Sequence, residues 1–411
     1  MTGATLTVWM HADPVADLAL DRRGRLTLRY RPEVVDRLGQ GALCLSVALP
    51  VRSTPHRHDP VERWIEGLLP EGETRTVLEQ RFAVRRGDTF GLLCALGRDC
   101  AGAVAFLDPH ETPPGHPEPT PQSYQQVTDA IADLPAHPLG ADEDVRVSLG
   151  GLQAKLLMTR TADGWARPTG GAPSTHLFKP DPPGMPGLVA SEALAMETIR
   201  QAGLDAARVE LLEFGGRPVL AVERYDRRVV DGAVRRIHQE DGCQALGLDP
   251  ARDKYQTVDG PPSYRALARM LADHAVEPLS QWRRLGELMT ATIALGNSDG
   301  HARNHSVLIE DGAVRLAPAY DVAPTVEFVT GRRAGLWIDG QPVLFAITRA
   351  HLTREMSSWG LPTAEATSLV DATLDRLATA LPAAADLVLV VDEALLDRCA
   401  TRITALATST G

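Results

Sequence analysis

The sequence predicts an α+β protein of two lobes, β-rich and then α-helical, preceded by an extra N-terminal α/β subdomain. Three observations predict this class. Short segments that alternate apolar and polar residues are frequent in the first half, longer segments with helical periodicity dominate the second half, and a proline-rich stretch divides the strand-rich part. We therefore divide the chain into residues 1–108, a linker or loop at 109–139, a small lobe at 140–225 and a large lobe at 226–411.

Length, composition and charge limit the class of protein. The 411 residues suffice for two or three domains, and 44% hydrophobic and 23% charged residues are ordinary for a globular chain. The net charge of −11 argues against direct, non-specific contact with nucleic acid, since such contact depends on Lys and Arg. No secretory signal and no apolar segment of membrane-spanning length is evident, so we expect a cytoplasmic protein without a membrane segment.

The cysteines indicate a reducing compartment. They are odd in number and show no Cys-x-x-Cys spacing, which argues against a disulfide framework or a zinc site. We expect buried thiols at Cys44, Cys94, Cys100, Cys243 and Cys399.

The N-terminal subdomain is predicted from short alternating and helical segments. Its expected strands are 6–10, 26–30, 43–49 and 103–107, and its expected helices are 60–69 and 89–96. No catalytic pattern is present, and we expect Arg98-Asp99 to form a surface turn. Six prolines between Asp108 and Gln122 disfavour regular structure and predict a linker or exposed loop.

The small lobe opens with a glycine turn. In residues 145–158, apolar strands flank Gly150-Gly151, and Lys155 follows. Glycines let backbone N–H groups approach an anion and the lysine adds positive charge, so this loop is suited to covering phosphates. A plain hairpin turn is the alternative interpretation.

The order of the next elements is that of a kinase small lobe. A strand at 175–179 ends in Lys179, and a helix at 190–202 begins near Glu192, which matches the lysine–glutamate ion pair of kinases. Strands at 209–214 and 217–222 lead into the polar segment 223–228, where a kinase places its adenine-reading hinge. A solvated edge lysine and a charged surface connection are the alternatives.

The large lobe is predicted to be mainly helical. An α-rich region opens at 239–241 and continues at Tyr264–His274. The helix expected at Ser280–Leu295, with Ser280 as its N-cap, is followed near the C-terminus by helices at Thr363–Leu381 and Asp392–Ala407.

The strongest functional pattern lies between residues 296 and 321. Alternating residues on both sides of Asp311-Gly312 predict a hairpin, which brings Asn304 before it and Asp321 after it to the same end, near Asp299. An Asp followed five residues later by an Asn is the spacing of a kinase catalytic loop, and these oxygen atoms suit Mg²⁺. An ordinary Asp-Gly turn is the alternative.

Together these segments make the chain resemble the HipA family of bacterial serine/threonine kinases, the toxins of HipBA toxin–antitoxin pairs. The resemblance covers about residues 5 to 400. Its segments in the kinase lobes are 147–155, 175–179, 221–228, 239–241, 299–304 and 320–321. Residues 8–10, 67–70 and 97–104 resemble the additional N-terminal domain of that family.

The resemblance implies a role for each matching position. Asp299 would be the catalytic base, and Asn304 and Asp321 would bind Mg²⁺. Lys155 and Lys179 would contact the ATP phosphates, and Glu223 and Tyr225 would lie at the adenine hinge. The remaining nucleotide contacts would come from Ser148, Gly150, Gly151, Gln153, Arg224 and His301. Two positions depart from the family pattern: Ala154 replaces an acidic residue, and Arg303 replaces a lysine whose charge it keeps with a different geometry.

The function implied is an ATP- and Mg²⁺-dependent protein kinase toxin. Its target would be a protein such as an aminoacyl-tRNA synthetase, it would autophosphorylate on Ser148, and a HipB-like helix-turn-helix antitoxin would neutralise it and link it indirectly to DNA. One alternative is a catalytically silent co-repressor bound to the antitoxin. Another is a metal-dependent phosphohydrolase built on Asp299, His301 and His305, which would leave Lys155 and Lys179 unexplained.

Overall fold

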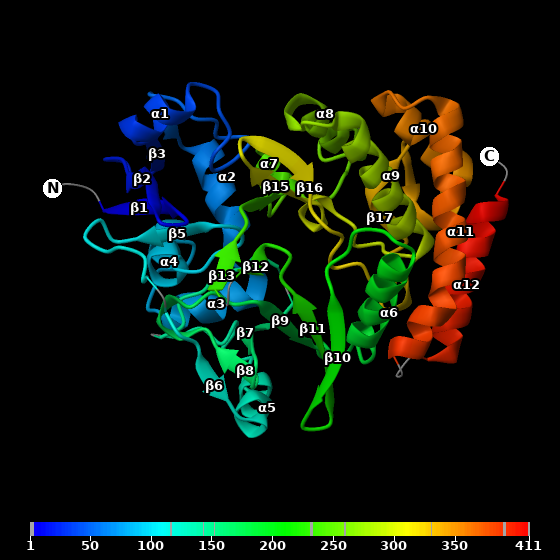
Figure 1. Ribbon diagram of the computed structural model, residues 1–411, viewed down its shortest axis with the longest axis horizontal. Coiled ribbons are helices and arrows are strands. Elements are labelled where there is room, and N and C mark those ends of the chain that lie inside the picture. The colour runs from blue at the N-terminus through cyan, green and yellow to red at the C-terminus, as the bar shows by residue number, and fades with distance from the viewer. Residues whose placement is uncertain are drawn as a thin grey trace.

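The N-terminal subdomain is an antiparallel sheet covered by helices (Figure 1). The computed structural model describes residues 4–115, 117–142, 144–151, 153–230, 233–258, 260–329, 331–388 and 392–409. The strand order is β4-β3-β2-β1-β5, with β1 Thr5–Met10, β2 Asp13–Leu20, β3 Leu26–Tyr30, β4 His56–Arg57 and β5 Val104–Leu107. The helices are α1 Pro32–Leu38, α2 Asp59–Leu68, α3 Gly72–Arg81 and α4 Thr89–Leu96. Helix α2 buries Val61, Trp64, Ile65 and Leu68 on one face, as its periodicity predicted.

Two expectations for this subdomain are wrong. Residues 43–49 form no strand, because side chains rather than a neighbouring strand bind their backbone. The Tyr30 hydroxyl donates to Leu49 O and accepts from Leu45 N, and the Glu240 carboxylate accepts from Val47 N. Asp99 is not in a surface turn, since it is only 1% exposed. Strands β2 and β4 and helices α1 and α3 were not foreseen.

The second sheet has the order β10-β11-β9-β7-β8-β6. Its strands are β6 Thr120–Gln122, β7 Leu156–Thr161, β8 Gly164–Arg167, β9 His176–Pro180, β10 Val209–Phe214 and β11 Arg217–Glu223. Helix α6, Leu188–Gln201, packs against β10 and β11, and η1 Thr169–Gly171 is a single turn. The strands at 176–180, 209–214 and 217–223 and helix α6 confirm their predictions within two residues.

Two segments beside this sheet differ from expectation. Residues 109–139 were predicted to be a linker, but they contain β6, which pairs with β8, and helix α5, Tyr124–Ala132. The side chains of Ser123 and Gln126 form a capping box that starts α5 despite the prolines before it. Residues 145–149 are not one arm of a hairpin, because Val147 is bridged in parallel to Asp99 of the N-terminal subdomain.

The C-terminal part is mainly helical. Its helices are α7 Gly242–Ala245, α8 Tyr264–His274, α9 Pro278–Ala294, α10 Arg349–Trp359, α11 Thr363–Val388 and α12 Glu393–Thr408. Its strands are β12 Arg227–Val230, β13 Ala233–Arg236, β14 Gln239–Asp241, β15 Ser306–Glu310, β16 Ala313–Leu316, β17 Arg333–Ile338 and β18 Gln341–Val343. Single 3-10 turns lie at η2 Ala302–Asn304, η3 Thr325–Glu327 and η4 Leu344–Ala346.

Most predicted elements of this part are present, with three corrections. Residues 239–241 form strand β14 rather than helix, because they pair with β15. Ser280 lies inside α9, since Pro278 already occupies the first helical turn after Glu277. Helix α11 continues past Leu381 to Val388, where buried Ala384 and Val388 still pack into the core.

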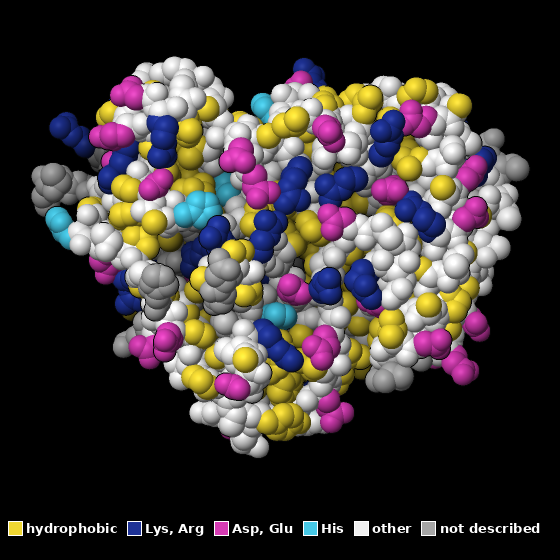
Figure 2. Space-filling view, viewed as in Figure 1, with side chains coloured by type: hydrophobic (Ala, Val, Ile, Leu, Met, Phe, Trp, Pro, Cys, Tyr) yellow, Lys and Arg dark blue, Asp and Glu magenta, His cyan; other side chains and the backbone are white. Residues whose placement is uncertain are grey.

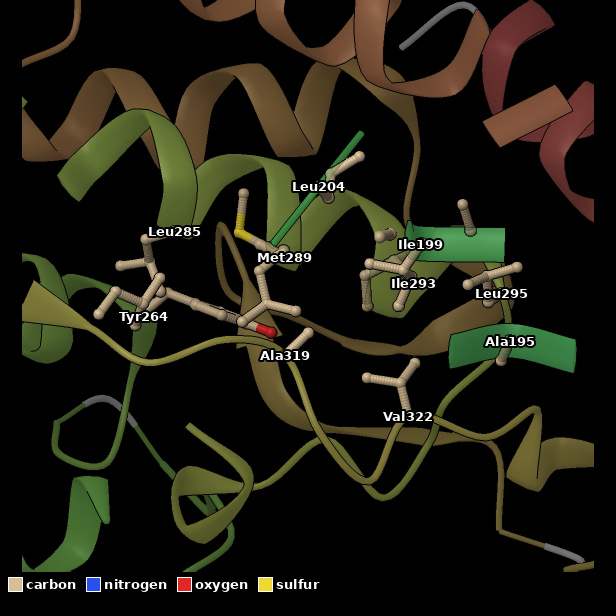
Figure 3. Close-up of a cluster of buried hydrophobic side chains, with 14 of the residues drawn as sticks. Ala195, Ile199, Leu204, Tyr264, Leu285, Met289, Ile293, Leu295, Ala319 and Val322 are labelled. Atoms are coloured by element: carbon tan, nitrogen blue, oxygen red, sulfur yellow. The ribbon is translucent and has the colours of Figure 1, made fainter. Parts of the chain in front are cut away.

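The largest core cluster joins the helices of the C-terminal part to α6 of the sheet domain. In Figure 3, Ile199 of α6 is drawn beside Ile293 of α9, and Leu285 of α9 lies toward Tyr264 of α8. Helices α6 and α9 both pack against the long helix α11, on the right in Figure 1. This shared core holds the β-rich and helical parts in one arrangement and so determines where their polar residues meet.

The cysteines agree only partly with the expectation that all five thiols are buried. All five cysteines are free thiols, but Cys94 is exposed on the outer face of α4 and Cys44 is only half-buried. Lys and Arg side chains gather near the middle of the face seen in Figure 2, where several acidic side chains lie among them. Within the described residues, no helix combines the length and apolar character that crossing a bilayer requires.

Candidate functional site

A cleft of about 490 Å³ lies where the second sheet, the N-terminal subdomain and the 296–321 segment meet. Its walls combine apolar residues such as Leu177 and Val222 with charged groups, which is the usual make-up of a small-molecule site. Twelve of the thirteen residues predicted for nucleotide, metal or base roles line it, and Ser148 is the exception. These twelve are Gly150, Gly151, Gln153, Lys155, Lys179, Glu223, Arg224, Tyr225, Asp299, His301, Asn304 and Asp321.

Asp299 is held by the loop that follows α9. Its backbone N–H donates to Asn297 Oδ1 at 3.0 Å and to Thr325 Oγ1 at 3.3 Å, and its carbonyl accepts from Asn304 Nδ2 at 3.0 Å. Burial raises the pKa of the Asp299 carboxyl, and a hydrogen bond from the Tyr255 hydroxyl opposes that rise without cancelling it. The loop therefore presents a carboxylate of increased basicity to the cleft.

Asn304 and Asp321 fit a magnesium site. The Asn304 amide nitrogen binds Asp299 O, and its oxygen has no hydrogen-bond partner in the described part of the chain. Asp321 has a φ of 58°, a conformation that is uncommon outside glycine, and 41% of its side chain is exposed to the cleft. The described residues contain no group of three His, Cys, Asp or Glu side chains suited to a metal. A pair of oxygen donors agrees with Mg²⁺, which is commonly bound by one or two carboxylates plus substrate phosphates.

Lys179 connects the sheet to this metal-type site. Its Nζ lies 2.7 Å from Glu192 Oε1 of α6 and 2.6 Å from Asp321 Oδ1. Burial alone would lower the pKa of Lys179, but the two carboxylates outweigh burial and raise it. Burial alone would also raise the pKa of Asp321, yet Lys179 brings it down to about 2. The lysine–glutamate pair expected from the order of the elements is thus present.

The glycine loop covers one side of the cleft. A Cβ atom at Gly150 would overlap the Arg303 guanidinium, and one at Gly151, whose φ is 108°, would lie 2.7 Å from Lys155 Nζ. Lys155 Nζ donates to Gly150 O at 2.8 Å, and Gln153 Nε2 donates to Pro180 O at 3.2 Å. Burial lowers the pKa of Lys155 to about 8, and the charge of Lys179 adds to that effect. Leu152 of this segment lies outside the described residues.

Ser148 is turned away from the cleft. Its hydroxyl donates to Leu68 O at 2.7 Å, its backbone N–H donates to Asp99 O at 2.8 Å, and it is only 1% exposed. In this conformation the serine is not among the cleft residues. A nucleotide or a phosphoryl group reaches it only after the loop moves.

The three residues predicted for the adenine hinge, at and just after the end of β11, differ in where their side chains lie. Glu223 is exposed at the end of β11, and the Tyr225 ring lies 5.4 Å from the Tyr320 ring while its hydroxyl donates to Gln239 Oε1. Arg224 directs its guanidinium into the protein, where it binds Asp226 and Ser174. Its side chain is therefore committed to an internal ion pair, and any contact of Arg224 with a nucleotide is left to its backbone.

The surroundings of His301 and Arg303 differ from what their motif indicated. His301 is buried, which lowers the pKa of its ring to about 3, and its Nδ1 has no hydrogen-bond partner in the described residues. Arg303 lines the cleft while its guanidinium is bound within the protein. Its guanidinium binds Asp241 Oδ2 at 2.8 Å, Gly67 O at 2.7 Å and the Glu71 carboxylate of the N-terminal subdomain.

Sequence reasoning missed the residues that reach the cleft from distant loops. Glu71 precedes α3, while Lys254 and Tyr255 lie between α7 and α8 in a segment without regular structure. Lys254 Nζ lies 3.1 Å from Glu71 Oε2. A Lys-Tyr pair in an irregular polar segment carries no local signal, so only the fold reveals these residues.

Comparisons with known proteins show which family of sequences this chain resembles. The HipA N-terminal domain model matches residues 6–107, and the HipA-like C-terminal domain model matches residues 147–381. The Y4mE protein of Sinorhizobium fredii is 36% identical over 335 residues, which cover 80% of this chain and 79% of that protein. The serine/threonine-protein kinase toxin HipA of Shewanella oneidensis is 27% identical over 400 residues, covering 93% of this chain and 89% of the toxin.

The structural comparison concerns the fold. A chain from the solved complex of the Shewanella oneidensis toxin–antitoxin proteins HipA and HipB with operator DNA matches with a TM-score of 0.85 and 24% identity. The match covers 98% of this chain and 96% of that chain. It confirms the α+β, bilobal fold class with an additional N-terminal subdomain that the sequence predicted.

Proposed function

The chain belongs to the HipA family, and from this premise we propose that it is an ATP- and Mg²⁺-dependent serine/threonine protein kinase, the toxin of a toxin–antitoxin pair. The observation that carries the proposal is the meeting of Asp299, Asn304 and Asp321 with the Lys179–Glu192 pair in one cleft. A scaffold that only binds partners has no need of this set. The boundaries near residues 108 and 225 are part of the proposal, while residues 109–139 belong with the second sheet because they contribute β6 and α5. The family match to residues 6–107 supports the first boundary.

The proposed reaction transfers the γ-phosphoryl group of ATP to a serine or threonine hydroxyl. Asp299 orients the hydroxyl and accepts its proton, while Lys155 and Lys179 hold the phosphates and the Gly150-Gly151 backbone covers them. Glu223, Arg224 and Tyr225 border the adenine end. Mg²⁺, which Asn304 and Asp321 would hold, neutralises charge on the phosphates when it is bound.

The decisive variant is Asp299→Asn. Because this change removes the proton acceptor and keeps the shape, phosphoryl transfer should fall by ~10²–10⁴-fold while ATP affinity is nearly unchanged. The control is Asp311→Asn in the turn between β15 and β16, which should keep full activity. Radiolabel transfer from γ-labelled ATP measures the rate, and calorimetry measures the affinity. Equal rates for Asp299→Asn and the parent would contradict the assignment.

The silent co-repressor and the phosphohydrolase are distinguished by nucleotide binding. A kinase should bind ATP more tightly with Mg²⁺, and Asp321→Ala should remove that difference, whereas a co-repressor should bind no ATP at all. The phosphohydrolase has less support, because His305 is buried against Tyr264 with ring centroids 5.2 Å apart and does not line the cleft.

Autophosphorylation of Ser148 is a further part of the proposal, and the family resemblance supports it. A phosphate would add roughly −1.5 to −2 charges to a serine that is buried against Leu68 O, so the modified loop could not return to this position. Incubation with Mg²⁺ and ATP followed by peptide mass spectrometry should find the phosphate in the parent and not in Asp299→Asn. Ser148→Asp should bind ATP more weakly than Ser148→Ala. An unmodified Ser148 in active enzyme would refute this part.

A HipB-like helix-turn-helix antitoxin is the proposed partner, and an aminoacyl-tRNA synthetase is the proposed type of target. One solved structure that shares the fold is a complex of HipA, HipB and operator DNA, which supports the proposed partner. The net charge of −11 supports contact with DNA through the antitoxin rather than alone. Tight, sequence-specific binding of DNA by the isolated chain in a gel shift would contradict this view. Phosphoproteomics after induction identifies the target.

A further inference from the structure

The side chain of Asp299 is held by a group outside the catalytic loop. The Asp299 backbone is fixed by Asn297, Asn304 and the His301 N–H of the loop and by Thr325 of η3. The carboxylate, by contrast, makes a single hydrogen bond in the described part of the chain, from the Tyr255 hydroxyl to Oδ1. Asp299 Oδ2 is left without a partner there. The direction of the carboxylate therefore depends on Tyr255.

Tyr255, which is 41% exposed, is held in place through its two neighbours. On one side, the carbonyl of Lys254 accepts from Ala302 N at 3.0 Å, which ties the segment to the catalytic loop. On the other side, Gln256 N donates to Gly335 O at 2.9 Å, and its side chain accepts from Trp337 N at 2.9 Å, which ties the segment to β17. The Tyr255 ring meets the His301 ring edge-on, with centroids 4.9 Å apart. Hydrogen bonds on both sides of Tyr255 thus hold the irregular segment that carries its hydroxyl.

We propose that Tyr255 is a positioning residue, which holds Asp299 Oδ1 so that Oδ2 faces the acceptor hydroxyl. The inference rests on the proposed kinase function and adds to it a residue that lies outside every motif of the sequence. A carboxylate on a single bond can rotate, and a fixed orientation of the base is a large part of its contribution to rate. The Tyr255 hydroxyl removes that freedom without contacting the substrate.

The test compares Tyr255→Phe with the parent in the full chain, using Mg²⁺, ATP and myelin basic protein as a generic serine/threonine acceptor. The variant loses the hydroxyl and keeps the ring against His301. We expect kcat to fall about ten-fold, the size associated with one hydrogen bond to a charged group, while KM for ATP and the calorimetric ATP affinity stay unchanged. The control is Tyr124→Phe, which removes a tyrosine hydroxyl that accepts a hydrogen bond from Gly215 N far from the cleft, and which should keep the parent kcat.

A double variant separates positioning from a structural role. If Tyr255 acts through Asp299, then Tyr255→Phe should have no further effect on the residual rate of Asp299→Asn, whereas a structural role would lower the rate equally in both backgrounds. An unchanged kcat in Tyr255→Phe overturns the inference. A higher kcat/KM for the acceptor protein also overturns it, because Tyr255 would then occupy the position of the acceptor hydroxyl. Phosphate found on Tyr255 overturns it as well, because the tyrosine would then be a phosphate acceptor. If the parent transfers no phosphate to any acceptor, the proposed function falls and this inference falls with it.

Discussion

At the residue scale, two buried lysines of the cleft differ in their charge chemistry. Lys179 lies between the carboxylates of Glu192 and Asp321, which raise its pKa. Lys155 has a backbone carbonyl as its hydrogen-bond acceptor, and burial lowers its pKa to about 8. Both were predicted to contact phosphates. Only the three-dimensional partners distinguish a permanent cation from one that loses its proton near physiological pH.

This difference predicts a pH dependence of ATP binding. Below pH 8 the Lys155 ammonium is present and attracts phosphates, and above it the free protein loses that proton and must take one up again to bind. ATP affinity should therefore fall as the pH rises from about 7 to 9.5, with proton uptake on binding. Calorimetry in buffers of different ionisation enthalpy measures both quantities. Lys155→Arg keeps its charge over this range, so an equal fall in that variant would contradict the explanation.

At the element scale, the catalytic loop is held between the N-terminal subdomain and β14. The link is Arg303 of η2, whose side chain is only 7% exposed and whose guanidinium contacts Glu71, Gly67 O and Asp241. The order of α9, loop and hairpin follows from local patterns. The loop's exact attachment comes from helix α2 and the residues just after it. The guanidinium thus serves as a structural fork that ties the loop to three partners.

Arg303→Lys tests whether the fork is required. A lysine keeps the charge but cannot reach three acceptors in one plane, so buried Asp241 or Glu71 loses a partner. The free energy of unfolding should be about 1–3 kcal/mol lower in the variant than in the parent. The control is Arg315→Lys in the half-exposed pair with Glu310, which should change stability by less than about 0.5 kcal/mol. Thermal or urea unfolding measures the difference. A fully stable Arg303→Lys would show that a lysine suffices here.

At the scale of the whole molecule, a buried ion cluster joins the N-terminal subdomain to the segment after β11. Asp99 Oδ1 lies 2.9 Å from Arg227 and 3.0 Å from Arg236, and Asp226 Oδ2 lies 2.8 Å from Arg224. Burial alone would raise the pKa of Asp99, but the arginines hold it well below its usual range. The cluster makes the N-terminal subdomain part of the frame behind the proposed adenine hinge.

Asp99→Asn should be strongly destabilising. Removing one partner from a buried ion cluster leaves uncompensated charge, so the free energy of unfolding should fall by about 3–5 kcal/mol. Because the pKa of Asp99 is lower in the folded protein, its stabilisation exists above the unfolded pKa and disappears as the pH falls. The variant should therefore lose less stability than the parent in acid. Asp36→Asn on the exposed side of α1 is the control, and urea unfolding across the pH range tests both statements. A parent-like stability would contradict them.

Local patterns in the sequence determined much of the fold and of the site. Helices α6 and α9, the β15–β16 hairpin and the order of Lys179 and Glu192 were predicted, because each depends on residues close together in the chain. The convergence of Asp299, Asn304 and Asp321 followed from the hairpin for the same reason. Apolar content alone misled at residues 43–49, where side chains of distant residues satisfy the backbone.

Only the tertiary structure decided which groups support those residues. Tyr255 and Asp299 are 44 positions apart, Asp99 and Arg227 are 128 apart, and Glu71 and Arg303 are 232 apart. The patterns of one sequence report spacing along the chain, whereas a hydrogen bond or ion pair depends on distance in space. The sequence by itself therefore determined the residues proposed for the chemistry, and the packing of the N-terminal subdomain and of the Lys254–Gln256 segment decided how they are held.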